Sequence, residues 1–234
     1  MDLDVAILCG GLGTRLGSLS KTCPKPMLKI GMKPFLEILI EHVASFGFDR
    51  IILCLGYLGP VIQAYFKNYH RVNLEFSMES RALGTAGGLK NAEGYFRKKW
   101  ILVMNGDSYC PVDLKALVQF HQGHDGIASM VVVPADQNRR DSGYITVNAQ
   151  NQVVDFREKQ YQAGRSINAG IYVFDASFLR FIPQQPPSSL ECDILPNSYQ
   201  EKIYAKFVDT KLYDIGTPER LEQFRRYARL QLTH

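Results

Sequence analysis

The chain has 234 residues, of which 46% are hydrophobic and 21% charged, so it is neither a disordered nor a collagen-like protein. Its net charge of +4 is too small to argue for nucleic acid as a partner. Five scattered cysteines without a CxxC pair disfavour a metal cluster or a disulfide framework and favour a reducing compartment. The chain starts without a basic signal-peptide segment, and no apolar run reaches the roughly 18 residues that span a bilayer. We therefore expect a cytoplasmic protein with no membrane partner.

The first half alternates short apolar runs with amphipathic stretches. The runs that we interpret as buried strands are residues 5–9, 51–55, 74–76 and 100–104. Residues 35–46 and 61–69 place apolar side chains at helical spacing and are expected to be helices. The β-α-β-α-β-α-β order that results favours a parallel sheet with helices on both faces.

The second half is more mixed. Several of its segments alternate apolar and polar residues and are predicted strands: residues 129–133, 144–147, 153–156, 169–174 and 204–208. Residues 218–232 are predicted to form a closing helix, with Thr217 as the N-cap and Pro218 at the first position. Because neither a repeat nor a linker interrupts the chain, we predict one α/β domain.

A glycine-rich segment, Gly10-Gly11-Leu12-Gly13-Thr14-Arg15, follows the first predicted strand directly. Glycines let backbone N–H groups approach phosphate oxygens, and the carboxyl end of a parallel strand is where open α/β sheets bind ligands. The dinucleotide-binding pattern is excluded because Leu16 stands where its third glycine would be, and no Gly-Lys-Ser/Thr follows as in a P-loop. The alternative is an ordinary tight turn.

Lys25 lies between Pro24 and Pro26, which stiffen the backbone and would fix the ammonium group as a point charge. By itself, Pro-Lys-Pro is more typical of an exposed loop. Together with Arg15 and the glycine-rich segment, however, the lysine suits a triphosphate ligand.

These two segments resemble the signature of the sugar-1-phosphate nucleotidylyltransferases. The resemblance continues in order along nearly the whole chain, at Leu83-Gly84-Thr85-Ala86-Gly87, Asn105-Gly106-Asp107, Glu158-Lys159, Asn168-Ala169-Gly170 and Asp214-Ile215-Gly216. One departure is Ser18 and Ser20, where many members have Pro and Thr. Within the family, the chain is most similar to the short guanylyltransferases that act on D-glycero-α-D-manno-heptose 1-phosphate, since its length leaves no room for the extra domains of longer members.

The resemblance implies a single-domain, Rossmann-like three-layer nucleotidyltransferase fold with a mostly parallel mixed sheet. Its nucleotide-binding part would be residues 1–110 and its sugar-binding part residues 111–234, approximately. It assigns catalysis to Arg15 and Lys25, and Mg²⁺ binding to Asp107 and Asp214. The implied nucleotide-binding residues are Cys9, Gly10, Gly11, Gly13, Thr14, Glu79, Gly84, Thr85 and Asp107. The implied sugar-binding residues are Gly143, Glu158, Lys159, Asn168 and Gly170.

Several of these residues have an ordinary structural alternative. Asp107 could simply form a turn after Gly106, and Asp214 could simply favour the start of the last helix through the helix dipole. Two carboxylates are nevertheless enough for Mg²⁺, which keeps water and substrate phosphates among its ligands. Glu158 and Lys159 could be ordinary surface charges.

Glu79 is the residue that the resemblance directs at the base. An ionised carboxylate only accepts hydrogen bonds, and guanine offers N1–H and N2–H₂ side by side as donors. Uracil and thymine present one ring N–H between two carbonyls, which a carboxylate repels. Glu79 therefore favours GTP, unless it is an exposed charge beside Arg81.

The expected reaction joins GTP to a sugar 1-phosphate, releases pyrophosphate, and supplies a nucleotide sugar for bacterial capsule or lipopolysaccharide. A phosphate monoester, with a second pKa of about 6, needs no general base. Alternatives are a mannose-1-phosphate guanylyltransferase, a uridylyltransferase for another sugar, and a non-catalytic nucleotide-sensing subunit. A glycosyltransferase is disfavoured because Asn105-Gly106-Asp107 replaces the usual Asp-x-Asp. A homodimer is left open.

Overall fold

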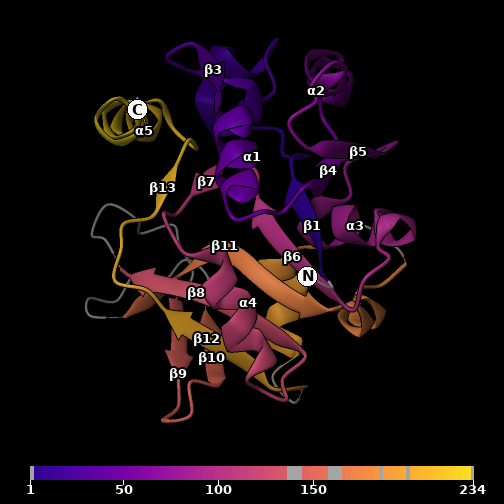
Figure 1. The fold of residues 1–234 in the computed structure, drawn as a ribbon, viewed down its shortest axis with the longest axis vertical. Helices are drawn as coiled ribbons and strands as arrows, with labels where there is room; N and C mark the ends of the chain where they lie inside the picture. Colours follow the sequence, from indigo (N-terminus) through magenta and orange to yellow (C-terminus); the bar gives the residue numbers. More distant parts are fainter. Residues whose placement is uncertain (1–2, 136–143, 158–164, 185–186, 199–200, 233–234) are drawn as a thin grey trace.

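The computed structural model describes residues 3–135, 144–157, 165–184, 187–198 and 201–232. Within this part of the chain, one nine-stranded mixed sheet forms the centre of the molecule (Figure 1). Its parallel half has the order β5 (Asn73–Met78), β4 (Arg50–Leu55), β1 (Leu3–Leu8) and β6 (Trp100–Asn105). The connecting helices are α1 (Phe35–Ser45), α2 (Gly59–Phe66) and α3 (Gly84–Asn91). The parallel β-α order expected for the first half is confirmed.

The second half adds antiparallel strands beside β6. The long strand β11 (Ser166–Asp175) lies antiparallel to β6 and joins the two halves. Beyond it lie β8 (Ala128–Pro134), β12 (Ile203–Phe207), β9 (Tyr144–Val147) and β10 (Val153–Arg157). β12 pairs parallel with β8, whereas β9 pairs antiparallel with both β10 and β11. The mostly parallel mixed sheet is therefore confirmed.

Helices cover both faces of this sheet and complete the three-layer, Rossmann-like arrangement. Alternation along β1 directs Val5 and Ile7 to one face and Ala6 to the other, and each side chain joins a separate apolar cluster. The cluster on the first face includes α1, α2, α4 (Leu114–Gln122) and α5 (Pro218–Gln231). The cluster on the second face includes α3, η4 (Ala176–Phe181), η5 (Leu190–Ile194) and η6 (Leu195–Asn197).

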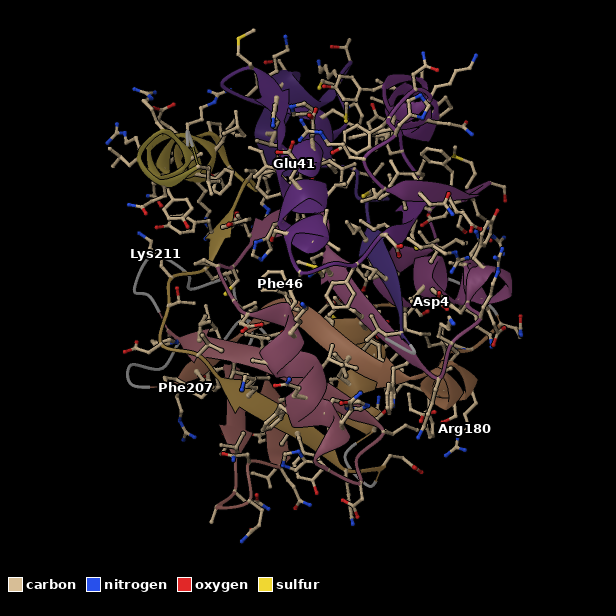
Figure 2. All side chains as sticks on the ribbon, in the orientation of Figure 1. Asp4, Glu41, Phe46, Arg180, Phe207 and Lys211 are labelled. Atoms are coloured by element: carbon tan, nitrogen blue, oxygen red, sulfur yellow. The ribbon has the colours of Figure 1, made fainter. Side chains whose placement is uncertain are left out.

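The last helix, α5, begins where the sequence predicts. Thr217 is its N-cap, and the Thr217 hydroxyl accepts a hydrogen bond from the backbone N–H of Arg220 at 3.3 Å. A short hairpin of β2 (Lys29–Ile30) and β3 (Lys33–Pro34) is tied to two helices. Lys33 donates to Glu41 of α1, which is labelled in Figure 2, at 2.6 and 2.7 Å. Arg225 of α5 donates to the Lys29 carbonyl.

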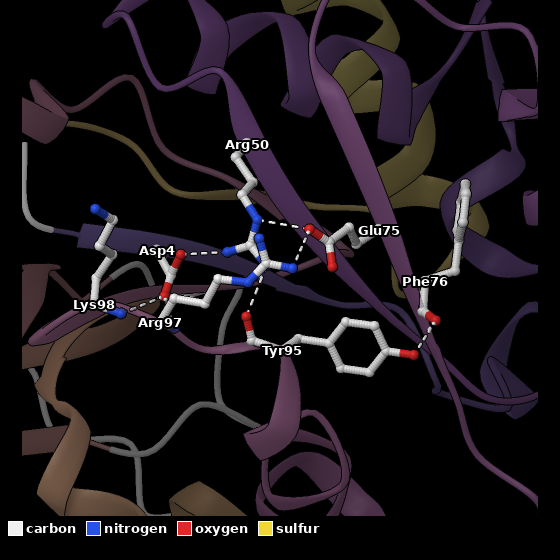
Figure 3. Close-up of polar contacts among 7 residues, drawn as sticks. All are labelled: Asp4, Arg50, Glu75, Phe76, Tyr95, Arg97 and Lys98. Carbon is white, nitrogen blue, oxygen red and sulfur yellow. Dashed lines mark hydrogen bonds and ion pairs between the residues drawn. The ribbon is translucent and has the colours of Figure 1, made fainter.

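The amino ends of β1, β4 and β5 are joined by an ionic network (Figure 3). Asp4, only 2% exposed, accepts hydrogen bonds from Arg50 and from the backbone N–H of Arg97. Arg50 also donates to Glu75 at 2.7 Å and to the Tyr95 carbonyl, on η3 (Glu93–Tyr95), at 2.7 Å. These contacts compensate the buried Asp4 carboxylate. None of the described helices has the length and apolarity to cross a bilayer.

Candidate functional site

A cavity of about 400 Å³ opens at the carboxyl ends of β1, β4 and β6, the edge at which open α/β sheets bind ligands. Every residue that the sequence assigns to nucleotide binding lines it: Cys9, Gly10, Gly11, Gly13, Thr14, Glu79, Gly84, Thr85 and Asp107. Lys25 and Asn105 also belong to its wall. The structure thus brings these separate motifs into one cavity, although their roles in binding stay predictions.

The glycines of the first loop meet different local demands. Gly13 has a φ of 63° and precedes the short helix η1 (Thr14–Ser20), so the left-handed backbone favours glycine there. At Gly10, an added Cβ would lie 2.8 Å from Glu79 Oε1, so a side chain there would have to displace the Glu79 carboxylate. At Gly11, no described atom lies within 4 Å of an added Cβ. Packing does not explain Gly11, which leaves open backbone facing the cavity.

Lys25 and Asp107 form an ion pair in the cavity wall. Lys25 begins the short helix η2 (Lys25–Met27) directly after Pro24, and its side chain is 9% exposed. The Lys25 ammonium donates to Asp107 Oδ2 at 2.5 Å. The Asp107 side chain, in the turn after β6, is 39% exposed. An ammonium that is held this firmly provides a fixed positive charge beside the glycine-rich loop.

The Asp107 carboxyl is kept ionised by its surroundings. Burial acts to raise its pKa, but the charge and hydrogen bond of Lys25, the hydrogen bond from Ser108 and the charge of Arg15 outweigh it. The net result is a pKa below the usual value for aspartate. The group is therefore available at neutral pH as an anionic oxygen ligand.

Asp214 is placed beside Asp107 by a pair of two-residue strands, β7 (Ser108–Tyr109) and β13 (Tyr213–Asp214). Asp214 is opposite Ser108 in this antiparallel pair. In addition, the backbone N–H of Ile215 donates to the Asp107 carbonyl at 3.0 Å. These contacts join the two aspartates, which are distant in the sequence, at the same end of the sheet.

Cations surround Asp214 as well. Its Oδ1 accepts from the Gly216 N–H at 2.7 Å, and its Oδ2 lies 3.4 Å from Arg220 Nη1. A Cβ added to Gly216 would lie 2.8 Å from Asp214 Oδ1. The same point is 3.6 Å from Lys25 Nζ and 3.7 Å from Arg15 Nη2. Arg15 and Asp214 thus lie next to the cavity, although neither contributes to its lining.

The two aspartates have the chemistry that Mg²⁺ requires. Within the described ranges, no cluster of three or more His, Cys, Asp or Glu side chains forms a complete metal site. Mg²⁺ usually binds one or two carboxylates and takes its other ligands from water and substrate phosphates. Asp107 and Asp214 fit this pattern, because the pairing of β7 with β13 and the Ile215 hydrogen bond place these two carboxylate residues at the same end of the sheet, beside the cavity.

Glu79 lies in the cavity wall next to Gly10, just beyond β5. Its Oε2 accepts the Leu83 N–H at 3.1 Å. An added Cβ would lie 2.6 Å from Glu79 Oε1 at Gly88 and 3.0 Å from Oε2 at Gly56, so glycines make the space for this carboxylate. Burial raises the pKa of Glu79, and the Leu83 hydrogen bond opposes this effect. Glu79 is therefore a half-buried cavity group and not a freely exposed charge.

On the sugar side, the structure describes two of the predicted residues. Gly143, Glu158 and Lys159 lie outside the described residues. Asn168 and Gly170 lie on β11, where the Gly170 N–H donates to Asn168 Oδ1 at 2.9 Å. Their contact with a sugar stays a prediction.

Gly170 also brings β11 against the nucleotide side of the cavity. It has a φ of 69°, and an added Cβ would lie 2.6 Å from Asn105 Nδ2. This left-handed backbone and close approach both demand glycine. The end of β6 and the predicted sugar segment are therefore in direct contact.

Two charged residues near the site, Arg220 and Glu191, lie outside the motifs that the sequence predicts to be functional. Arg220 lies in the first turn of α5, where the dipole gives no reason to expect a cation. Glu191 accepts hydrogen bonds from Thr85 and Asn105 across more than 80 positions of sequence. The only local signal is Ser189, a typical N-cap residue, and it indicates a helix start and not a role for Glu191.

Residues 5–229 match the family model described as nucleotidyl transferase. The chain is 32% identical over 219 residues to D-glycero-alpha-D-manno-heptose 1-phosphate guanylyltransferase from Aneurinibacillus thermoaerophilus, covering 93% of this chain and 94% of that protein. It is 34% identical over 224 residues to mannose-1-phosphate guanylyltransferase from Mycobacterium tuberculosis, covering 93% of this chain but only 62% of that protein.

A crystal structure of HddC from Yersinia pseudotuberculosis in complex with GMP-PN has a similar fold. It superposes with a TM-score of 0.84 at 34% sequence identity, covering 96% of this chain and 98% of that one.

Proposed function

The chain belongs to the nucleotidyl transferase family, and we propose that it is a sugar-1-phosphate guanylyltransferase that converts GTP and D-glycero-α-D-manno-heptose 1-phosphate into the GDP-heptose and pyrophosphate. The observation that carries the proposal is the fixed Lys25–Asp107 pair at the edge of a glycine-lined cavity. Fixed cations and open backbone N–H groups suit a triphosphate. The cavity is also large enough for a small-molecule ligand.

The chemistry follows from the charges in the site. An oxygen of the sugar 1-phosphate bonds to the α-phosphorus of GTP while the bond to the α,β-bridging oxygen breaks and pyrophosphate leaves. The attacking phosphate is mostly dianionic at pH 7, so no side chain has to remove a proton. The main obstacle is repulsion between two polyanions, and positioned cations lower it.

Two cations of the chain serve this purpose in the proposal. Lys25, beside the glycine-rich loop, offsets the negative charge that develops around the α-phosphate. Arg15 steadies the leaving pyrophosphate. Its Nη2 and the Lys25 Nζ both lie within 4 Å of the position that a Cβ on Gly216 would take. Asp107 and Asp214 would hold Mg²⁺, which when bound supplies further positive charge to the phosphate oxygens.

The choice of GTP rests on Glu79. Its half-buried carboxylate presents acceptor oxygens to the cavity and matches the two adjacent donors of guanine. Glu79→Gln places an NH₂ group against one of those donors, so we expect the preference for GTP over UTP, as the ratio of kcat/KM, to fall about tenfold or more. Glu93→Gln, at an exposed position of η3, is the matched control. An unchanged ratio in Glu79→Gln would refute the assignment.

The choice of heptose rests on relatives. The heptose 1-phosphate guanylyltransferase matches this chain over 94% of its own length, whereas the chain spans 62% of the mannose 1-phosphate enzyme at comparable identity. Mannose 1-phosphate is therefore the second candidate. The proposed setting is the cytoplasm, and the proposed use of the product is bacterial surface polysaccharide. Dimerisation stays a prediction.

A single panel tests the proposal. Pyrophosphate release is measured with four nucleoside triphosphates, each crossed with heptose, mannose and glucose 1-phosphates, with and without Mg²⁺. We expect the highest kcat/KM for GTP with heptose 1-phosphate, and loss of turnover without the metal. Binding of GTP with no turnover of any sugar phosphate would instead favour the nucleotide-sensing subunit. A UTP preference would overturn the assignment of the base.

A further inference from the structure

The Glu191 carboxylate, on η5, accepts four hydrogen bonds, two of them from the cavity residues Thr85 and Asn105 and one from Tyr172 of β11. Its Oε2 accepts from the Thr85 hydroxyl at 2.7 Å and from the Ser189 hydroxyl at 3.0 Å. Its Oε1 accepts from the Tyr172 hydroxyl at 3.3 Å and from Asn105 Nδ2 at 3.4 Å. A carboxylate has about four lone-pair positions, so these donors use its whole capacity.

One of these donors belongs to the segment after Leu83 that lines the nucleotide cavity. The Thr85 hydroxyl donates to Glu191 and also accepts the Leu190 N–H at 2.8 Å, so its orientation is fixed from both sides. The neighbouring Gly84 has a φ of 75°, and an added Cβ would lie 2.3 Å from the Ser188 carbonyl oxygen. The Gly84–Thr85 turn is therefore packed directly on the segment that carries Glu191.

Two other donors to Glu191 contact the predicted sugar-binding residues of β11. Tyr172, fully buried on β11, donates to Glu191 and accepts from Asn168 Nδ2 at 2.6 Å. Asn105, at the end of β6, donates to Glu191 and lies against Gly170. The Asn105 amide is oriented by this carboxylate directly, since its alternative orientation would place an acceptor where a donor is needed. The Asn168 amide is held between the Gly170 N–H and the Tyr172 hydroxyl, so the carboxylate acts on it only through Tyr172.

We propose that Glu191 is a positioning residue for both substrates. It orients Thr85, a predicted nucleotide-binding residue, and through Tyr172 and Asn105 it also orients the β11 segment that carries the predicted sugar-binding residues. This inference rests on the proposed function, because it assigns the two sides to GTP and sugar phosphate. Glu191 does not reach the reacting atoms in this scheme. It acts by being an acceptor-only group among four donors, which an amide cannot replace.

The experiment compares Glu191→Gln with variants that remove one contact each. Thr85→Val removes the nucleotide-side hydroxyl, and Thr85→Ser restores it. Tyr172→Phe removes the sugar-side hydroxyl. Glu201→Gln is the matched control, since Glu201 pairs with Arg180 at the surface, away from the cavity (Figure 2). KM and kcat are measured for GTP and heptose 1-phosphate, and each melting temperature is recorded.

We expect Glu191→Gln to raise the KM for both substrates, each by about tenfold to a hundredfold, as is typical for loss of hydrogen bonds to a charged group. Thr85→Val is expected to raise mainly the KM for GTP, with recovery in Thr85→Ser. Tyr172→Phe is expected to raise mainly the KM for the sugar phosphate. The Glu201→Gln control should behave as the unmodified protein.

Three results would overturn the inference: unchanged KM values in Glu191→Gln, a change for one substrate only, or a lower melting temperature with normal kinetics in the folded fraction. If Glu191→Gln does not fold, Thr85→Val and Tyr172→Phe test the inference instead. The inference is then refuted if Thr85→Val does not raise mainly the KM for GTP and Tyr172→Phe does not raise mainly the KM for the sugar phosphate. A failure of the proposed function is distinct, because the unmodified protein would itself release no pyrophosphate from this substrate pair.

Discussion

Replacing Lys25 by methionine separates its charge from its packing. Methionine keeps most of the buried aliphatic stem and removes only the ammonium that donates to Asp107 at 2.5 Å. Removal of one fixed group that stabilises transition-state charge typically costs about 2.7–4 kcal/mol, or a 10²–10³-fold decrease in kcat. We expect a decrease of that size here.

The fold should tolerate the same change. Asp107 is 39% exposed and keeps its hydrogen bond from Ser108, so water can solvate the carboxylate once Lys25 is gone. We therefore expect the free energy of unfolding to fall by only about 1 kcal/mol, well below the cost of an isolated, fully buried charge.

The assay combines pyrophosphate release under saturating GTP and sugar phosphate with urea unfolding of the same preparation. Lys25→Arg retains the charge in a different shape and should keep more activity than Lys25→Met. A kcat for Lys25→Met within threefold of the unmodified protein would refute the electrostatic role. A loss of stability above about 3 kcal/mol would show that the ion pair is chiefly structural.

Two further predictions concern stability. Arg50→Met removes the ionic partner of Asp4, which is 2% exposed. Urea unfolding should show that the free energy of unfolding falls by about 3–5 kcal/mol, while the KM for both substrates stays normal. An unchanged free energy of unfolding would mean that water replaces the arginine. Partial burial of His42 lowers its pKa to about 4, and a backbone hydrogen bond with Val112 acts in the opposite direction. Its unfolded form, with a pKa near 6.5, takes up a proton first as the pH falls, so its contribution to stability is complete above about pH 6.5 and is lost towards pH 4. From pH 7 to pH 5 we expect a loss of about 2 kcal/mol from this residue, and His42→Phe should remove that part of the slope; an identical slope in the variant would contradict the assignment.

The sequence predicts the elements whose signals are local. The apolar run of β1 and the helical spacing of α1 come from the pattern of apolar residues, and the start of α5 at Thr217 and Pro218 comes from capping. The motifs of the site, from Gly10 to Asp214, could likewise be assembled from their resemblance to a family, and the structure brings all of those it describes around or beside one cavity.

Other elements have no such local signal. Helix α3 (Gly84–Asn91) is rich in glycine, which disfavours helices, and its first residue has the left-handed backbone that contact with Ser188 demands. Strands β7 and β13 have two residues each, too few for any periodicity, and exist only because they pair with each other.

Local pattern therefore determined which segments of this chain become strands and helices and which residues could meet a phosphate. Only the tertiary structure decided the contacts between them, such as Lys25 with Asp107 and Glu191 with Thr85. The physical reason is that an ion pair or hydrogen bond depends on the distance between two atoms in space. That distance is set by how the sheet orders its strands, which no window of neighbouring residues contains.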